Sequence, residues 1–219
     1  MELHEARIAI LLENLYQELE LWYPVMRFRE AGADVRILAP SADEVYGSKL
    51  GYPATADHDV TAVDATSFDA VIIPGGFSPE YLRRHQPSVD LVRRANELDR
   101  IVAAICHAGW MLATAGIAKG RNATCVPVIR DDLVNAGATY LDEPVVRDGN
   151  LITSRLPNDL PQFCDAIATA LGERVPCDGP ALPPLTVPSS AVYTSAALVK
   201  NRAAGPASAN YRAYATLVG

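Results

Sequence analysis

The hydrophobic positions of the chain fall into short runs rich in Val, Ile and Ala, separated by longer stretches with helical spacing. The runs occupy residues 6–12, 34–39, 69–74 and 101–105, with weaker ones at 122–128 and 150–153. The helical stretches lie at 16–31, 79–98, 107–117 and 161–172. Short apolar runs that alternate with helices are typical of a parallel sheet covered on both faces. We therefore predict a doubly wound α/β fold with a mostly parallel sheet.

The end of the chain departs from this alternation. From about residue 173 the sequence is rich in Ala, Pro and Ser and shows no amphipathic period up to Gly219. We therefore divide the chain into a domain at 1–172 and an extension at 173–219, whose composition is typical of a loosely packed tail. Within the domain, residues 147–150 (Arg-Asp-Gly-Asn) predict a hairpin turn that carries an antiparallel strand at the margin of the sheet.

Composition and charge narrow the class of protein. Hydrophobic residues make up 49% of the 219 residues and charged residues 21%, which suffices for one sizeable core. The net charge of -7 opposes contact with a phosphate backbone, so we expect no nucleic acid partner. The chain starts without a secretory signal pattern, and no apolar run approaches membrane-spanning length. We therefore expect a cytoplasmic protein with no membrane partner.

Motifs for cofactors and metals are missing from the sequence. No GxGxxG or GxxxxGK[ST] pattern opens a helix, so no nucleotide cofactor is expected. The four cysteines form no CxxC pair and are too sparse for a disulfide scaffold; they are Cys106, Cys125, Cys164 and Cys177. We expect neither a cofactor nor a metal, and each cysteine is considered on its own.

One cysteine stands at a junction that favours reactivity. The apolar run at 101–105 ends at Cys106, and a helical pattern starts at once. A nucleophile on such a strand-to-helix elbow needs small residues two positions before and after it, and Ala104 and Ala108 meet this requirement. The elbow places the sulfur at the carboxyl edge of the sheet, near a helix amino terminus that lowers the pKa of a thiol. Cys106 is the predicted nucleophile, with His107 as a neighbouring proton acceptor.

Two further segments reach the same edge of the sheet. Gly75 and Gly76 follow the run at 69–74, and their backbone amides, with that of His107, would form an oxyanion hole. Glu20 lies in the helical stretch after the first run, where its carboxyl group would share a proton with the Cys106 sulfur or act as general acid and base. A solvated surface glutamate is the alternative for Glu20.

Six segments together resemble the DJ-1/PfpI superfamily, and specifically its PfpI-like branch, over about residues 6–172. They read ELELWYP, SKLGYPATAD, PGGFSPEYLRR, AAICHAGWMLATAGIAKGR, DDLVNAG and ITSRLPNDLPQF. The resemblance implies a class I glutamine amidotransferase-like fold, which is a flavodoxin-like sheet with a nucleophile elbow. It also implies that Cys106 is the nucleophile, that Glu20 hydrogen-bonds it, and that Gly75, Gly76 and His107 supply the surrounding amides.

The same resemblance implies a role for Glu80. In PfpI-like proteases the matching glutamate comes from a neighbouring subunit and orients the elbow histidine. Glu80 would therefore complete a triad with Cys106 and His107 across a subunit interface. A homo-oligomer of two or more subunits is expected on this basis.

Three function classes stay open, because members of this superfamily perform different reactions. The leading hypothesis is a hydrolase of the peptidase or amidase type, with Cys106 as nucleophile, His107 as proton carrier and an oxyanion hole. The alternative is a glyoxalase or deglycase acting on 2-oxoaldehydes or their adducts, in which Glu20 moves protons between carbons; the superfamily also includes isocyanide hydratases. The third class is a non-enzymatic oxidative-stress sensor whose thiolate is oxidised to sulfinate. The expected partner is thus a small-molecule or peptide substrate.

Overall fold

A seven-stranded sheet forms the centre of the computed structural model, which describes residues 1–183 and 185. The strand order is β10-β11-β7-β6-β1-β2-β5, and every neighbouring pair is parallel except β10 with β11. The strands are β1 (Arg7–Leu11), β2 (Asp34–Ala39), β5 (His58–Asp59), β6 (Ala70–Ile73), β7 (Ile101–Ile105), β10 (Val145–Asp148) and β11 (Leu151–Ser154). The predicted doubly wound, mostly parallel α/β fold is confirmed.

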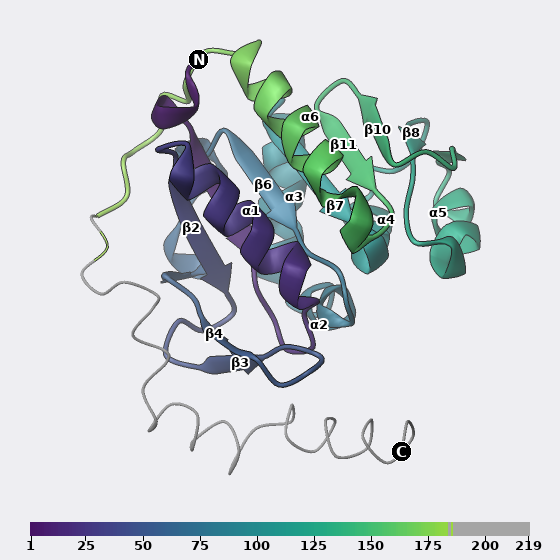
Figure 1. Cartoon of the computed structure of the whole chain (residues 1–219), viewed down its shortest axis with the longest axis horizontal. Helices are drawn as coiled ribbons and strands as arrows, with labels where there is room; N and C mark the ends of the chain where they lie inside the picture. Colours follow the sequence, from purple (N-terminus) through teal and green to yellow (C-terminus); the bar gives the residue numbers. More distant parts are fainter. Residues whose placement is uncertain (184, 186–219) are drawn as a thin grey trace.

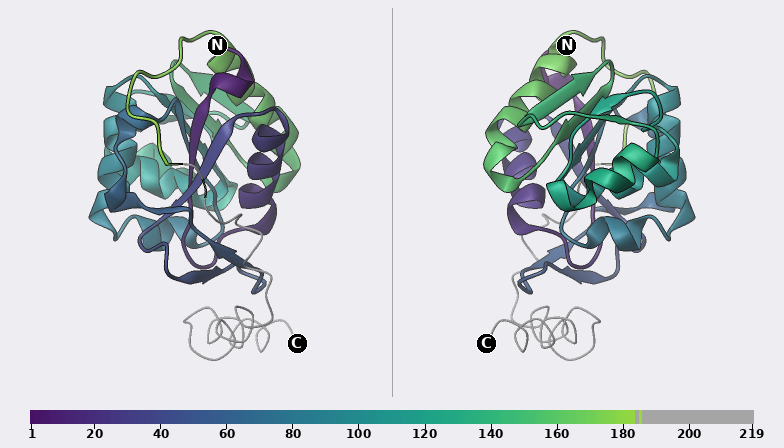
Figure 2. Two further views of the ribbon diagram at one scale, coloured as in Figure 1. Left: turned by 90° about the vertical axis from the view of Figure 1, so that its left-hand side faces the viewer. Right: turned by 90° about the vertical axis from the view of Figure 1, so that its right-hand side faces the viewer.

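Helices cover both faces of this sheet. The longer ones are α1 (Glu18–Glu30), α3 (Gln86–Glu97), α4 (Gly109–Ala115) and α6 (Leu160–Gly172). Figures 1 and 2 show α1 and α6 on one face and α3 and α4 on the other, and each pair is in contact. All residues of β6 and β7 are buried, because both faces of these central strands lie under helices.

Shorter elements connect this framework. They are α2 (Ser78–Leu82), α5 (Arg130–Asn135), β3 (Val45–Gly47), β4 (Pro53–Thr55), β8 (Asn122–Ala123), β9 (Thr139–Tyr140), and the 3-10 turns η1 (Leu3–Glu5), η2 (Val60–Ala62), η3 (Ala65–Ser67), η4 (Cys106–Ala108), η5 (Pro127–Ile129) and η6 (Pro157–Asp159). The predicted hairpin is confirmed by β10 and β11, which are joined at Gly149 in a left-handed conformation (φ 58°). No helix among the described residues is long and apolar enough to cross a membrane.

Two element predictions are wrong, and proline explains both. The helical stretch at 79–98 is two helices, α2 and α3, which places Pro87 in the first turn of α3, where its missing N–H breaks no helical hydrogen bond. The apolar run at 122–128 contributes only the two residues of β8, which pair with β9 outside the central sheet. Pro127 starts η5 there, since proline cannot donate to a strand ladder.

The beginning of the extension packs against the domain. Residues 175–183, which we call the strap, run past the amino-terminal ends of the central strands; they form part of the yellow-green segment in Figure 2. The Arg7 guanidinium donates to the carbonyls of Cys177, Gly179 and Pro180 at 2.5, 2.9 and 3.0 Å. Asp69 accepts from the amide of Cys177 at 2.5 Å. Loose packing is thus wrong for the strap, and the rest of the predicted extension lies outside the described residues.

Candidate active site

The predicted site residues come from three segments at the carboxyl edge of the sheet. The loop into α1 follows β1, the Gly75-Gly76 loop follows β6, and Cys106 follows β7. β1 stands between β2 and β6, so the chain builds the sheet first to one side of β1 and then to the other. Open α/β sheets bind ligands at such a switch point, outside the carboxyl ends of the strands.

Cys106 sits on the sharp turn that the sequence predicts. Its φ is +62°, one of only three positive values among the described non-glycine residues. This conformation costs about 1–3 kcal/mol and persists only where packing enforces it. Ala104 and Ala108 are both buried beside the turn, and the amide of Val126 donates to the Cys106 carbonyl at 3.4 Å. The Cys106 side chain is left with little exposure, since the residue is 8% accessible.

Glu20 is fully buried and lies against the elbow. The side chain of Gln17 caps the start of α1 by accepting from the Glu20 amide at 2.9 Å. Glu20 Oε2 accepts a hydrogen bond of 2.7 Å from the amide of Gly75. The other carboxyl oxygen, Oε1, has no well-aligned hydrogen bond among the described residues, although the Cys106 thiol is close enough to lower the pKa of the carboxyl. The solvated-surface alternative for Glu20 is therefore wrong.

Gly75 is the residue that lets these two side chains meet. A Cβ atom at this position would lie 2.5 Å from Glu20 Oε2 and 2.6 Å from the Cβ of Cys106. Both distances are far inside van der Waals contact, so only glycine fits between the carboxyl and the elbow. Position 76 also favours glycine, for a different reason: its φ is +72°, and a Cβ atom there would collide with the carbonyl oxygen of Leu15.

The amides do not all act as the sequence predicts. The Gly75 amide is already bonded to Glu20, so its predicted role as a free oxyanion donor is wrong. The amides of Gly76 and His107 are directed at the Cys106 sulfur and lower the pKa of its thiol. Two of the three predicted donors are thus positioned at the reactive atom, where they would stabilise a thiolate or an oxyanion formed beside it.

Burial dominates the protonation of the pair. It raises the pKa of Glu20 to about 7, against smaller lowering effects from the Gly75 amide, the Cys106 thiol and the charge of Lys49. Burial and the negative charge of Glu20 raise the pKa of Cys106 to about 12. The expectation of a depressed thiol pKa is therefore wrong, because desolvation outweighs the amides and the short η4 turn. Between these two values the pair holds one proton.

His107 is held between aromatic rings. Its imidazole stacks on Phe77 at 5.6 Å between centroids and is tilted against Trp110 at 4.9 Å. Burial and the charge of Lys49 lower the pKa of His107, so the ring is neutral at physiological pH. Its Nδ1 is buried without a hydrogen-bond partner in the described part of the chain.

Glu80 does not reach His107 within the subunit. Its carboxylate pairs with Arg84 at 2.8 Å and with Arg83 at 3.5 Å, both on or next to its own short helix. The structure therefore brings together Cys106, Glu20 and the amides, but not the complete triad. A triad shared between subunits stays a prediction.

Lys49 is the functional candidate that the sequence analysis missed. Its charge lowers the pKa of both Glu20 and His107, which places it beside the centre. The signal was present, because Lys49 belongs to the SKLGYPATAD segment that carries the family resemblance. A single lysine in a loop indicates no chemistry by itself, because the sequence does not show which other segments the loop contacts.

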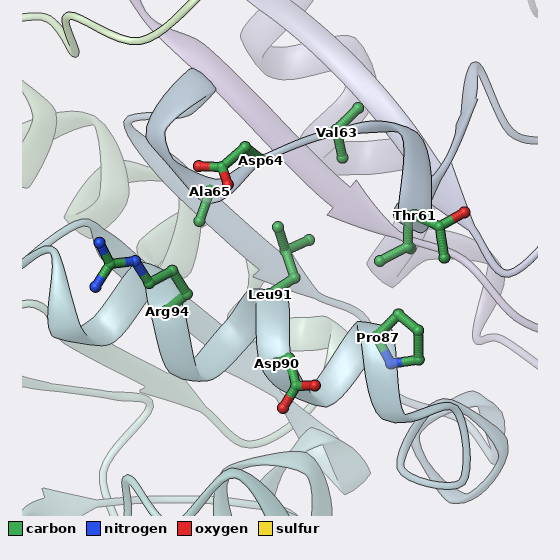
Figure 3. Close-up of a pocket in the computed structure, with 9 residues that line it drawn as sticks. Thr61, Val63, Asp64, Ala65, Pro87, Asp90, Leu91 and Arg94 are labelled. Carbon is green, nitrogen blue, oxygen red and sulfur yellow. The ribbon is translucent and has the colours of Figure 1, made fainter.

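A separate hollow lies elsewhere on the molecule. It has a volume of about 340 Å³ and is formed by η2, η3 and α3, and Leu91, Asp64 and Arg94 are among the residues that line it (Figure 3). None of the predicted site residues lines it. Across residues 1–183 and 185, no group of three or more His, Cys, Asp and Glu side chains is arranged to hold a metal ion.

Comparison with known proteins identifies the family of this chain. The family model described as the DJ-1/PfpI family matches residues 6–170. An uncharacterized protein of Archaeoglobus fulgidus is 46% identical over 165 residues, which cover 75% of this chain and 98% of that protein. A deglycase of Thermococcus kodakarensis is 39% identical over 154 residues, with 70% and 92% covered.

A solved structure shows the same fold. It is a two-domain protein from Anabaena variabilis with DJ-1/ThiJ/PfpI-like and ferritin-like domains, 41% identical with a TM-score of 0.75. The match covers 76% of this chain and 48% of that one. The family model, the relatives and the solved structure agree on the family, and this chain belongs to the DJ-1/PfpI family.

Proposed function

We propose that the protein is a cysteine-dependent deglycase or glyoxalase acting on 2-oxoaldehydes or their adducts with amines and thiols. The observation that carries the proposal is the buried Glu20 carboxyl, whose pKa is about 7, next to the elbow cysteine. Moving a proton between neighbouring carbons requires one group that gains and loses a proton near neutral pH. The deglycase name of the Thermococcus kodakarensis relative supports the same reaction class.

The first step is addition of sulfur to the aldehyde carbon. As the bond between the Cys106 sulfur and the substrate forms, the thiol proton passes to the Glu20 carboxylate. General-base assistance is needed because burial raises the pKa of the free thiol. The amides of Gly76 and His107 would stabilise the oxyanion that develops beside the sulfur. An adduct R–X–CH(OH)–CO–CH₃ first breaks its C–X bond as the hydroxyl proton passes to X, which releases R–XH and the 2-oxoaldehyde, and the aldehyde carbon then adds to Cys106.

The second step moves a proton along the bound carbon chain. Glu20 first gives the thiol proton to the oxyanion, which forms the hemithioacetal and restores the carboxylate. It then takes the proton from the former aldehyde carbon and returns it to the neighbouring carbonyl carbon, while the hydroxyl proton moves to the neighbouring oxygen, which converts the hemithioacetal into a thioester. Water then hydrolyses the thioester to a 2-hydroxy acid and restores the thiol. The net reaction, a 2-oxoaldehyde plus water giving a 2-hydroxy acid, needs no redox partner.

Lactate formation from methylglyoxal tests the proposal. The wild-type protein should form lactate, and Cys106→Ser should lose the activity. The matched control is Cys164→Ser, because Cys164 is also buried but lies in α6. Equal lactate formation by wild type and Cys106→Ser, or none by wild type, contradicts the proposal.

The hydrolase hypothesis now ranks second. It needs an acid that orients His107, and within the subunit Glu80 is paired with arginines instead. A fluorogenic peptide assayed beside methylglyoxal distinguishes the two reactions. The sensor hypothesis requires a thiolate that oxidises readily, and burial of Cys106 with a raised pKa opposes this.

A further inference from the structure

Backbone contacts connect the loop that carries Lys49 to the candidate active site. Its amide donates to the carbonyl of Tyr16 at 3.0 Å, and Tyr16 in turn forms an antiparallel bridge with Gly76. Gly76 directs its own amide at the Cys106 sulfur. These backbone contacts fix the loop that carries Lys49 to the same edge of the sheet as the elbow.

Lys49 forms no ion pair within the part of the chain that the structure describes. The residue is exposed, and no salt bridge to it is found between residues 1 and 183 or at 185. Glu18 on the neighbouring helix contacts the same loop, because its carboxylate accepts from the Ser48 hydroxyl and, at 2.9 Å, from the Leu50 amide. Glu18 therefore holds the loop in place through these two groups and makes no ion pair with the ammonium group.

The groups around Lys49 fit an anion better than a cation. His107 is kept neutral by burial and by Lys49, so of these two side chains Lys49 alone carries the positive charge that would attract an anion. Phe77 is 53% exposed and forms, with His107 and Trp110, an aromatic wall along which a substrate carrier can lie. The negative charge of the centre itself, on Glu20, is fully buried, whereas the positive charge of Lys49 faces the solvent.

We propose that Lys49 selects substrates that carry a carboxylate close to the reacting carbon, that is, adducts of 2-oxoaldehydes with thiols or amines of acidic carriers. This inference rests on the proposed function for its choice of substrate. Lys49 acts as a specificity residue at the entrance and takes no part in the proton transfers at Glu20. A free, uncharged 2-oxoaldehyde gains nothing from it.

The first test needs no turnover. Iodoacetate and iodoacetamide alkylate the same sulfur and differ in one negative charge, so the ratio of their rate constants at Cys106 reports the local preference for anions. Lys49→Gln should lower this ratio about two- to fivefold, the size expected for one exposed charge. Changes in the reactivity of the thiol itself cancel in the ratio. Added salt should weaken the preference of the wild type.

The second test uses substrate. Hemithioacetals of methylglyoxal with N-acetylcysteine and with N-acetylcysteine amide differ only in the carboxylate, and the adduct concentration is measured in each. At about pH 8.5 Glu20 is ionised with or without Lys49, since its pKa is about 7. Lys49→Gln should then raise KM for the anionic adduct about two- to fivefold, with kcat and the amide adduct unchanged.

Lys119→Gln is the matched control. Lys119 is also exposed, but it lies after α4, whereas Lys49 lies in the loop between β3 and β4. It should change neither the alkylation ratio nor the preference between adducts. An alkylation ratio that is the same in wild type and Lys49→Gln overturns the inference. Absence of any Cys106-dependent turnover overturns the proposed function instead, and the alkylation ratio still decides whether Lys49 attracts anions.

Discussion

The side chains of Glu20 and Cys106 share one buried site, and each negative charge raises the free energy of the other. Burial raises the pKa of both groups, while two amides favour the thiolate and one favours the carboxylate. The state with one proton, as carboxylate and thiol, therefore forms as pH rises through about 7. In this state Glu20 is ready to accept the thiol proton during attack, which makes it the group that sets the pH dependence of turnover.

Replacing Glu20 by Gln should move two measurements in opposite directions. Lactate formation should fall about 10²–10⁴-fold, because the general base is lost. Alkylation of Cys106 by iodoacetamide at neutral pH should become faster, because removal of the carboxylate charge lowers the pKa of the thiol. In wild type, kcat/KM should rise with pH through about 7 as Glu20 ionises.

Glu30→Gln is the control for this variant, since Glu30 is exposed at the other end of α1. It should leave turnover and alkylation unchanged. A Glu20→Gln protein with full turnover rules out the proton transfer proposed for Glu20. A slower alkylation shows that the carboxyl group assists the thiolate rather than opposing it.

Glu20 should also make the protein less stable as pH rises. Its pKa is about 7 in the folded state and near 4.5 when unfolded, so the folded state binds more protons between these values. Stability therefore decreases from pH 4.5 to 7, by roughly 3 kcal/mol for this group. Urea unfolding at several pH values should show that the stability of Glu20→Gln relative to wild type increases as pH rises across this range. A constant difference between the two proteins contradicts the raised pKa.

At the scale of elements, local sequence predicts the strands and the elbow but not the contacts between segments. Val and Ile runs identify β1, β2, β6 and β7 because strands buried on both faces carry few polar residues. The elbow is predictable because small residues must flank it. The protonation of Cys106 is not, because it depends on Glu20, which is 86 positions away in the chain and brought close by the fold. For the same reason, the sequence alone does not predict that the loop with Lys49 contacts the segments around the elbow.

The contact between α1 and the elbow depends on the absence of a side chain at Gly75. Gly75→Ala should push Glu20 and Cys106 apart, since the new Cβ would lie within 2.6 Å of atoms of both. We expect a loss of about 1–3 kcal/mol in stability and at least 10²-fold in lactate formation. Gly172→Ala is the control, because a Cβ at this position in α6 meets no atom within 4 Å. Normal turnover by Gly75→Ala contradicts the close packing of the pair.

At the scale of the whole molecule, the strap and the candidate active site lie at opposite ends of the parallel strands. Arg7 and Asp69, at the starts of β1 and β6, bind the strap, whereas Cys106 follows the end of β7. Asp69 is 2% exposed and accepts from the strap as well as from the Arg7 amide. The Archaeoglobus fulgidus relative is covered to 98% by 165 matched residues, which leaves it little length for a counterpart. The composition alone suggests a loose tail here. A segment rich in Pro and Gly shows no periodic pattern, so the sequence does not reveal which of its backbone amides and carbonyls bind the domain.

Two truncations separate the strap from the rest of the extension. Removal of residues 175–219 leaves the Arg7 guanidinium without its three carbonyl partners and takes one donor from the buried Asp69. Removal of residues 184–219 keeps all of these contacts. We expect the longer truncation to be less stable than the shorter one by about 2–4 kcal/mol, or roughly 5–15 °C in Tm.

Both truncated proteins should react with iodoacetamide at Cys106 as fast as the full chain does, because the strap lies far along the strands from the elbow. Gly179→Ala in the full chain gives an independent test, since its Cβ would lie 2.0 Å from the carbonyl oxygen of Thr66 and displace the strap without shortening the chain. It should reproduce much of the loss in Tm. Equal melting of the two truncations shows that the strap does not stabilise the domain, and a change in alkylation rate shows that the two ends of the sheet are coupled.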